Sequence, residues 1–207
     1  MRSTGEVMGI ADSFGMAFAK AQQAADNALP LEGAIFITVN DGDKAAVMPI
    51  VGQFHEMGFT LYATEGTAKY LRGRGIPARI VKKVHEGRPN GIDLMVNGEV
   101  QLLINTPLGR HAQHDDYLLR RTAIAQRVSY TTTMSAARAA SDAILALRSR
   151  HASVRSLQEW HQDGKAARAL AGSTEPGDPA DVTPAGDSRN GGSIRATPRM
   201  APREAST

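Results

Sequence analysis

"FTLYATEGTAKYLRGRGI", residues 59–76, joins a mostly apolar run directly to a segment with helical periodicity. Residues 59–63 have the length and aromatic content of a β-strand, and residues 68–74 predict a helix. Short strands that pass straight into short helices are the units from which parallel sheets are built. The stretch therefore predicts one strand and one helix of an α/β fold.

The same alternation continues on both sides of this stretch. Further strands are predicted at 34–39, 78–81, 100–105 and 128–130. Further helices are predicted at 47–57, 92–96 and 114–126, with a long one beginning after a cap at Thr133 or Ser135. Such short intervals predict a three-layer open parallel sheet of about five strands, with helices on both faces and right-handed crossovers.

Pro49 interrupts the periodicity of the helix predicted at 47–57. If Asp43 is the N-cap, Pro49 falls beyond the first turn, where its missing N–H removes a helical hydrogen bond. We therefore expect a kink or a later start in this helix.

Both ends of the chain differ from the middle in composition. Residues 1–30 are rich in alanine, with helical periodicity that Pro30 stops. From residue 173 onward the sequence is rich in proline and glycine and has few large apolar side chains, so we expect disorder there. Before it, Leu157 and Trp160 lie on one face of a last predicted helical piece. We accordingly predict an α/β domain at 31–160 and a mostly disordered tail at 161–207.

Composition excludes several classes of function. There is no run of 18 apolar residues and no apolar block near the N-terminus, so neither a membrane partner nor a secretory signal is expected. The absence of cysteine excludes disulfides and thiolate metal sites, and a cytoplasmic protein is expected. The net charge of +3 comes from scattered residues without a block of like charges. This pattern favours a small anionic ligand over a nucleic acid.

Ligands of open α/β sheets bind outside the carboxyl ends of the strands. The loops at those ends are rich in cations and hydroxyls, and they are predicted at 40–44, 64–67, 82–91, 106–110 and 131–134.

The sequence "TEGT" at 64–67 has the properties of a phosphate loop. Gly66 permits a close approach of the backbone, and Thr67 is placed to cap the following helix, whose first amides attract anions. Alone, such a pattern is more often an ordinary cap. Lys44 and Lys83 follow two neighbouring strands, however, and their convergence favours a phosphate site.

Adjacent histidine and acidic residues raise the question of a metal site. His85 and Glu86 are neighbours on a loop and point in divergent directions, so a metal is not expected. We expect instead that His85 or Arg88 binds a carboxylate or a phosphate. Asp115 lies near the start of the helix predicted at 114–126, where a capping role is favoured.

Seven motifs occur in order along roughly residues 1–160. They are "MRSTGEVMGI", "FAKAQ", "DGDK", "ATEGTA", "KVHEGRP", "INT" and "SYTTT". This set closely resembles the C-terminal end of the large chain of carbamoyl phosphate synthetase, a regulatory domain of the methylglyoxal-synthase-like fold. Residues 1–30 are similar to the end of the preceding ATP-grasp synthetase domain and its connecting helix. The resemblance thus implies a fragment of a longer enzyme.

The resemblance also implies a function. In that family the domain binds uridine monophosphate (UMP) as inhibitor and inosine monophosphate (IMP) as weak activator, in overlapping sites. The parent enzyme is a glutamine-hydrolysing ligase that supplies carbamoyl phosphate for pyrimidine and arginine biosynthesis. It uses ATP, Mg²⁺ or Mn²⁺, and K⁺, and it pairs with a small glutamine amidotransferase subunit. This chain is expected to be regulatory, to contact the synthetase domain of the same large chain, and to hold no cofactor itself.

Site residues follow from the matching motifs. By resemblance, the nucleotide phosphate is held by a lysine and threonine cradle, and the nucleoside side is lined by an asparagine: Lys44, Thr64, Gly66, Thr67, Lys83 and Asn105. Pro107 stands where the family has another threonine, which removes one hydroxyl.

A partial ornithine site is implied at Tyr130 and Thr132. Thr131 replaces an acidic residue of the family there, and the remaining carboxylates belong to the synthetase domain. Negligible affinity for ornithine is therefore expected of this chain.

An enzyme with the same phosphate cradle is the alternative. Methylglyoxal synthase, a lyase acting on dihydroxyacetone phosphate, needs a carboxylate base in a Gly-Gly-Asp loop after the third strand. Here the loop reads "HEGRPNG", and the base position falls on or near Arg88, whose guanidinium cannot accept a proton. The inosine cyclohydrolase domain shares the fold, but "MRSTGEVMG" has no place in it. The regulatory function is therefore favoured.

Overall fold

The computed structural model describes residues 6–106, 110–149 and 152–163. The chain divides into two compact units, Met1–Val154 and Arg155–Thr207. In the second unit the described residues form a helix at 157–163, which confirms the predicted helical piece. Its start is a reciprocal cap, because the Glu159 amide donates to Ser156 Oγ and the Glu159 carboxylate accepts from the Ser156 amide. The predicted tail from residue 173 lies outside the described residues.

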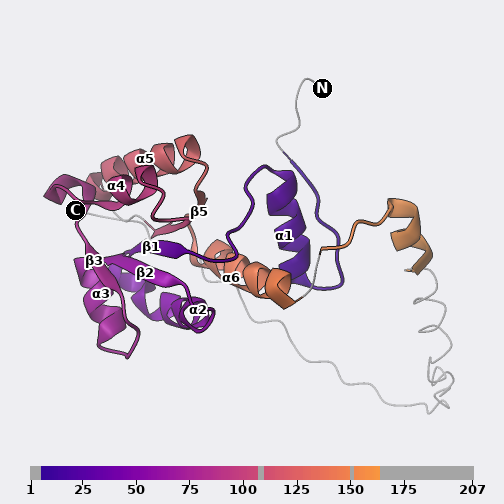
Figure 1. Cartoon of the computed structure of the whole chain (residues 1–207), viewed down its shortest axis with the longest axis horizontal. Helices are drawn as coiled ribbons and strands as arrows, with labels where there is room; N and C mark the ends of the chain where they lie inside the picture. The colour runs from indigo at the N-terminus through magenta and orange to yellow at the C-terminus, as the bar shows by residue number, and fades with distance from the viewer. Residues whose placement is uncertain (1–5, 107–109, 150–151, 164–207) are drawn as a thin grey trace, which may run out of the picture. The chain divides into compact units, whose positions relative to one another are not determined.

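The first unit is built on a five-stranded sheet with all strands parallel (Figure 1). The spatial order is β3-β2-β1-β4-β5, so the first strand is central. The strands are β1 Ala34–Val39, β2 Thr60–Thr64, β3 Arg79–Val81, β4 Leu102–Thr106 and β5 Ser129–Thr131. The predicted parallel sheet is confirmed, with each strand within two residues of its expected position.

Helices cover both faces of the sheet, so the architecture has the three layers that were predicted (Figure 1). One face packs against α2 Lys44–Glu56, α3 Glu65–Arg72 and α6 Met134–Ser149. The other packs against α4 Gly91–Val96 and α5 Arg110–Ala125.

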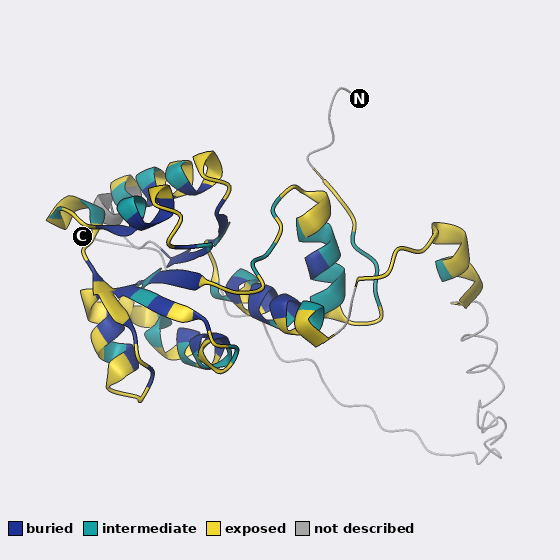
Figure 2. Cartoon of the chain, in the orientation of Figure 1, coloured by how far each residue is buried: buried dark blue, intermediate teal, exposed yellow. Residues whose placement is uncertain are grey.

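Strand β1 explains why two cores form. Its side chains alternate, with Ile35 and Ile37 in the first core and Ala34 and Phe36 in the second. Nearly the whole strand is dark blue, meaning buried, in Figure 2. A strand covered on both faces is expected to be apolar throughout, as "AIFITV" nearly is.

Helix α1 Phe14–Ala24 packs against α6 in the same unit. The two backbones approach closely, because a Cβ on Gly15 would lie 2.7 Å from the Asp142 carbonyl oxygen. The helix ends before Pro30, the expected stop, since Asp26 adopts a φ of 56° and turns the chain out of the helix.

The expected later start of the helix around Pro49 is wrong. Helix α2 begins at Lys44 and contains Pro49 in its interior. A 3₁₀ turn, η1 Asp41–Asp43, leads into the helix and is capped by the Asn40 side chain. The turn fixes the start of α2. The helix then continues through Pro49, although the nitrogen of Pro49 donates no hydrogen bond.

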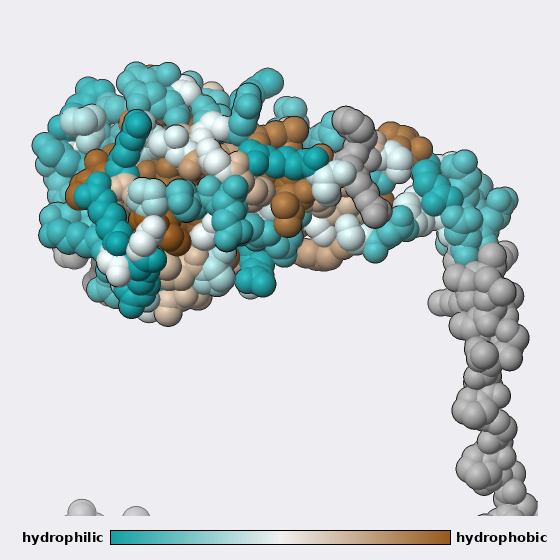
Figure 3. All heavy atoms as spheres, turned by 60° about the horizontal axis from the view of Figure 1, so that its bottom comes forward, coloured by the Kyte–Doolittle hydropathy of each residue, from teal (hydrophilic) through white to brown (hydrophobic). Residues whose placement is uncertain are grey.

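None of the helices in the described residues has the length and apolar character needed to cross a membrane. Figure 3 shows a mainly hydrophilic surface with separate apolar patches on the face turned to the viewer.

Gly91 generates a prediction about packing. A Cβ at this position would lie 2.2 Å from Phe36 Cε1, so the buried Phe36 ring would have to move out of its packed position. Gly91→Ala should therefore lower the free energy of unfolding by about 1–3 kcal/mol, measured by urea denaturation. Gly52→Ala is the control, since the nearest atom to its added methyl is Ile76 Cδ1 at 3.9 Å. A helical alanine should there leave stability unchanged or raise it by up to about 1 kcal/mol. Equal stability of the two variants would contradict the packing argument.

Candidate functional site

A cavity of about 480 Å³ opens at the carboxyl ends of the strands. Its walls come from the carboxyl ends of β1, β2 and β4, from the segments after β1 and β3, and from α4 and α5. Apolar side chains such as Phe36 and Leu119 form part of the lining. The polar and charged lining residues are Thr38, Asn40, Asp41, Thr64, Lys82, Lys83, His85, Asn105, Thr106, Asp115 and Asp116.

Three of the six predicted effector-binding residues, Thr64, Lys83 and Asn105, line this cavity directly. The other three adjoin it at the start of α3. The Lys44 ammonium nitrogen lies 3.4 Å from where a Cβ on Gly66 would be. Thr67 is buried, and its Oγ1 accepts a hydrogen bond from Thr64 Oγ1 at 3.3 Å. The structure thus brings all six residues to one end of the sheet.

The predicted capping role of Thr67 at the start of α3 is wrong. The helix begins at Glu65 rather than at Ala68, so Thr64 takes the N-cap position and Thr67 lies within the first turn. No side chain caps this helix among the described residues, because the hydroxyls of Thr64 and Thr67 bond to one another. The first amides of α3 therefore keep their capacity to bind an anion.

Asn40 fixes the loop between β1 and α2. Its Oδ1 accepts from the Asp43 amide at 3.1 Å, and its Nδ2 donates to Asp43 Oδ2 at 2.6 Å. The same Nδ2 lies 3.3 Å from the carbonyl oxygen and the Oγ1 of Thr106, at the end of β4. The amide of Asn40 thereby joins the ends of two neighbouring strands and sets where Lys44 begins α2.

The two predicted lysines act on the same carboxylate. Lys44 Nζ pairs with Asp41 Oδ1 at 2.6 Å. This contact lowers the pKa of Asp41 below its ordinary value, mainly through the hydrogen bond, and the positive charge of Lys83 lowers this pKa further. Asp41 and Lys83 both line the cavity, so the Lys44–Asp41 pair and the Lys83 side chain lie at the same end of the sheet.

Carboxylates from α5 mark another part of the cavity. Asp115 Oδ2 lies 2.6 Å from His85 Nδ1. Asp116 is buried and accepts from Asn105 Nδ2 at 2.6 Å and from Arg120 at 2.5 Å. The cavity thus combines a lysine-rich region with two carboxylates that are already held in place.

The role expected for Asp115 is wrong, whereas that expected for His85 is confirmed. Helix α5 begins at Arg110, so Asp115 lies in its second turn and cannot cap it. His85 binds a carboxylate, as expected, and that carboxylate is Asp115. Asp116 was not among the predicted site residues. Its i,i+4 spacing to Arg120 was the one available signal, and many surface pairs share that spacing.

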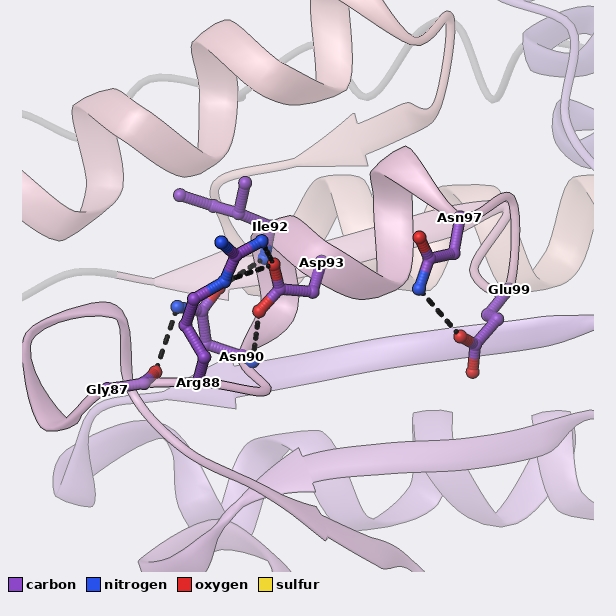
Figure 4. A network of polar contacts seen from close by, with 7 residues as sticks. All are labelled: Gly87, Arg88, Asn90, Ile92, Asp93, Asn97 and Glu99. Carbon is purple, nitrogen blue, oxygen red and sulfur yellow. Dashed lines mark hydrogen bonds and ion pairs between the residues drawn. The ribbon is translucent and has the colours of Figure 1, made fainter.

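Arg88 also binds a carboxylate, that of Asp93, within an ordered turn (Figure 4). Asp93 Oδ2 accepts from the Asn90 amide at 2.9 Å, and Asn90 Oδ1 accepts from the Ile92 amide at 2.9 Å. Asp93 raises the pKa of Arg88, mainly through their hydrogen bond. The residue at the position of the lyase base is therefore held as a cation.

The residues of the implied ornithine site do not line the cavity. Tyr130 packs against the core under α4 and α5, whereas Thr132 is exposed. Between them, Thr131 Oγ1 is buried and lacks a partner in the part of the chain that the structure describes.

Within the same described ranges, no group of three or more histidine or acidic residues could hold a metal ion. Pro107, where a family hydroxyl is missing, lies outside the described residues.

The Arg88–Asp93 pair gives a prediction about pH. The pKa of Asp93 is lowered by Arg88 and then by the Asn90 amide, so its stabilising effect is complete above the ordinary aspartate pKa of about 3.9. The effect is lost as the pH falls through the lowered pKa. Asp93→Asn should reduce the urea midpoint at pH 7 and reduce the further loss between pH 4 and pH 2. Glu56→Gln, at an exposed site on α2, should keep the acid profile of the unmodified chain. An unchanged acid profile in Asp93→Asn would contradict this role.

Comparison with known proteins agrees with the resemblance seen in the motifs. The MGS-like domain family matches residues 46–132. The carbamoyl phosphate synthase large chain of Gemmatimonas aurantiaca is 60% identical over 180 residues, which are 85% of this chain and 16% of the relative. That of Acidobacterium capsulatum is 51% identical over 78% of this chain and 15% of its own length.

A third relative, from Methanopyrus kandleri, is named carbamoyl phosphate synthase large chain, C-terminal section. It is 47% identical over 78% of this chain and 30% of its own length. The chain thus spans less than a third of each of these relatives. It carries an MGS-like domain and belongs to the family of carbamoyl phosphate synthase large chains, whose C-terminal section it matches.

Proposed function

We propose that the cavity binds a nucleoside monophosphate, UMP or IMP, and that this binding regulates the synthesis of carbamoyl phosphate. The catalytic activity would be that of an ATP-dependent, glutamine-hydrolysing ligase, as the name of the relatives suggests. The synthetase domain of the same large chain and a small glutamine amidotransferase subunit would be its partners. ATP, divalent metal and K⁺ would act in those other parts, and the residues described above would act as a sensor.

The observation that carries this proposal is that Lys83 and Asp41, the ion-pair partner of Lys44, line one cavity beside the start of α3. A phosphomonoester has about 1.5 to 2 negative charges near pH 7 and three acceptor oxygens. Two ammonium groups, the Thr64 hydroxyl and the free amides of α3 supply complementary charge and donors. No single one of these groups would suffice, but together they suit a phosphoryl group.

The remaining lining suits the nucleoside. Phe36, Val84 and Leu119 offer apolar surface to a base and sugar. Asp115 and Asp116 offer carboxylate oxygens to hydroxyl or N–H donors of the ligand. A volume of about 480 Å³ is within the range of small-molecule sites.

Regulation would follow from differential affinity. A bound nucleotide would connect the loops after β1, β2 and β3, and it would favour whichever arrangement of the domain against the synthetase core holds those loops best. Only that difference in affinity can change the activity, and couplings of this kind amount to about 1–3 kcal/mol.

Lys83→Ala tests the phosphate end of the site. Loss of one charge-assisted hydrogen bond should weaken UMP binding by about 1.5–3 kcal/mol, or roughly 10- to 100-fold, in calorimetric titration. Lys69→Ala is the matched control, since this exposed lysine pairs with Glu65 on α3 and does not line the cavity. Its affinity should stay within about twofold of the unmodified chain, a difference below 0.5 kcal/mol.

Two results would overturn the proposed function. One is the absence of UMP and IMP binding by the unmodified chain at millimolar concentration. The other is turnover of dihydroxyacetone phosphate with release of phosphate, which would establish the lyase instead.

A further inference from the structure

Asp41 is an acidic residue at the lysine-rich region of the cavity. Its carboxylate lies 2.6 Å from Lys44 Nζ, and its side chain is 93% exposed, whereas that of Lys44 is 18% exposed. An exposed carboxylate thus covers a mostly buried ammonium group. In the described part of the chain, Lys44 is the only ion-pair partner of Asp41.

The partners of Asp41 are the cations assigned above to the phosphate. Lys44 bonds to it directly, and Lys83 lines the same cavity. A phosphoryl group that binds both lysines must therefore take over the contact with Lys44. It must also accept a second negative charge beside it, unless the carboxylate turns away.

The loop determines how Asp41 can respond. Asn40 bonds to Asp43 and to the end of β4, so the backbone on either side of Asp41 is held in place. The Asp41 side chain itself has no such restraint and faces solvent. Displacement by a phosphate would therefore require rotation of one side chain and no movement of the loop.

We propose that Asp41 is a built-in competitor that lowers the affinity of this site for phosphate and so sets the ligand concentration at which the site fills. The inference rests on the proposed anion-binding function of the cavity. Lys44 and Lys83 strengthen phosphate binding, whereas Asp41 weakens it. The competing explanation is that Asp41 only positions Lys44, in which case its loss would weaken binding.

Asp41→Asn separates the two explanations, because it removes the charge and keeps the shape. We expect UMP and inorganic phosphate to bind about three- to tenfold more tightly to this variant, the scale of one unit charge at a solvated site. The measurement is calorimetric titration of the full chain at low ionic strength. At 0.5 M KCl the gain should shrink, because an exposed charge is screened.

Glu56→Gln is the matched control. It changes the net charge equally, but Glu56 is an exposed residue at the end of α2 and does not line the cavity. Its affinity for both ligands should stay within about twofold of the unmodified chain, which excludes a general effect of net charge.

The outcomes distinguish this inference from the proposed function. Equal or weaker phosphate binding by Asp41→Asn, or an equal gain in Glu56→Gln, would overturn the competitor role. If phosphate binds to the unmodified chain and binds more tightly to Asp41→Asn, but UMP binds no better than phosphate, the inference stands and the nucleotide function fails. If neither ligand binds to the unmodified chain or to Asp41→Asn, both fail.

Discussion

The burial of β1 on both faces is the constraint on which the rest of the structure depends. A central strand that packs against helices on either side must have parallel neighbours whose connecting helices return over the sheet. The strands then end at the same edge, and the loops after β1, β2, β3 and β4 meet there. The cavity is thus a consequence of the topology, and only its chemistry is left to the individual loop residues.

Positive and negative side chains lie at different parts of the cavity. Lysines gather where β1, β2 and β3 end, and the carboxylates of α5 lie at the end of β4, with apolar side chains in the same lining. The α5 carboxylates are occupied by His85, Asn105 and Arg120, so they are held in position by the protein itself. Such an arrangement would suit the proposed ligand, which has an anionic phosphate at one end and hydrogen-bond donors at the other.

The strands, and the meeting of the predicted site residues at one end of the sheet, could be predicted from sequence because both depend on local patterns. β-branched and apolar runs mark the buried strands, and loops at strand ends follow from the fold. Helix starts were less predictable. α3 and α5 begin earlier than periodicity indicates, since the first residues of both are mostly polar and add nothing to the apolar periodicity. The pairs His85–Asp115 and Asn105–Asp116 join residues 30 and 11 positions apart, and no local pattern encodes them.

The side-chain amide of Asn40 has a further consequence. By bonding to both Asp43 and Thr106, it makes the loop before Lys44 and the strand end beside Asn105 a single mechanical unit. Any force that a ligand exerts on Asn105 is therefore transmitted to the frame from which Lys44 projects. Two ligands that share a charged group but differ in the rest of the molecule would then bind that group with different geometry. The proposed regulation by two nucleotides would need such a difference if one cavity is to produce opposite responses.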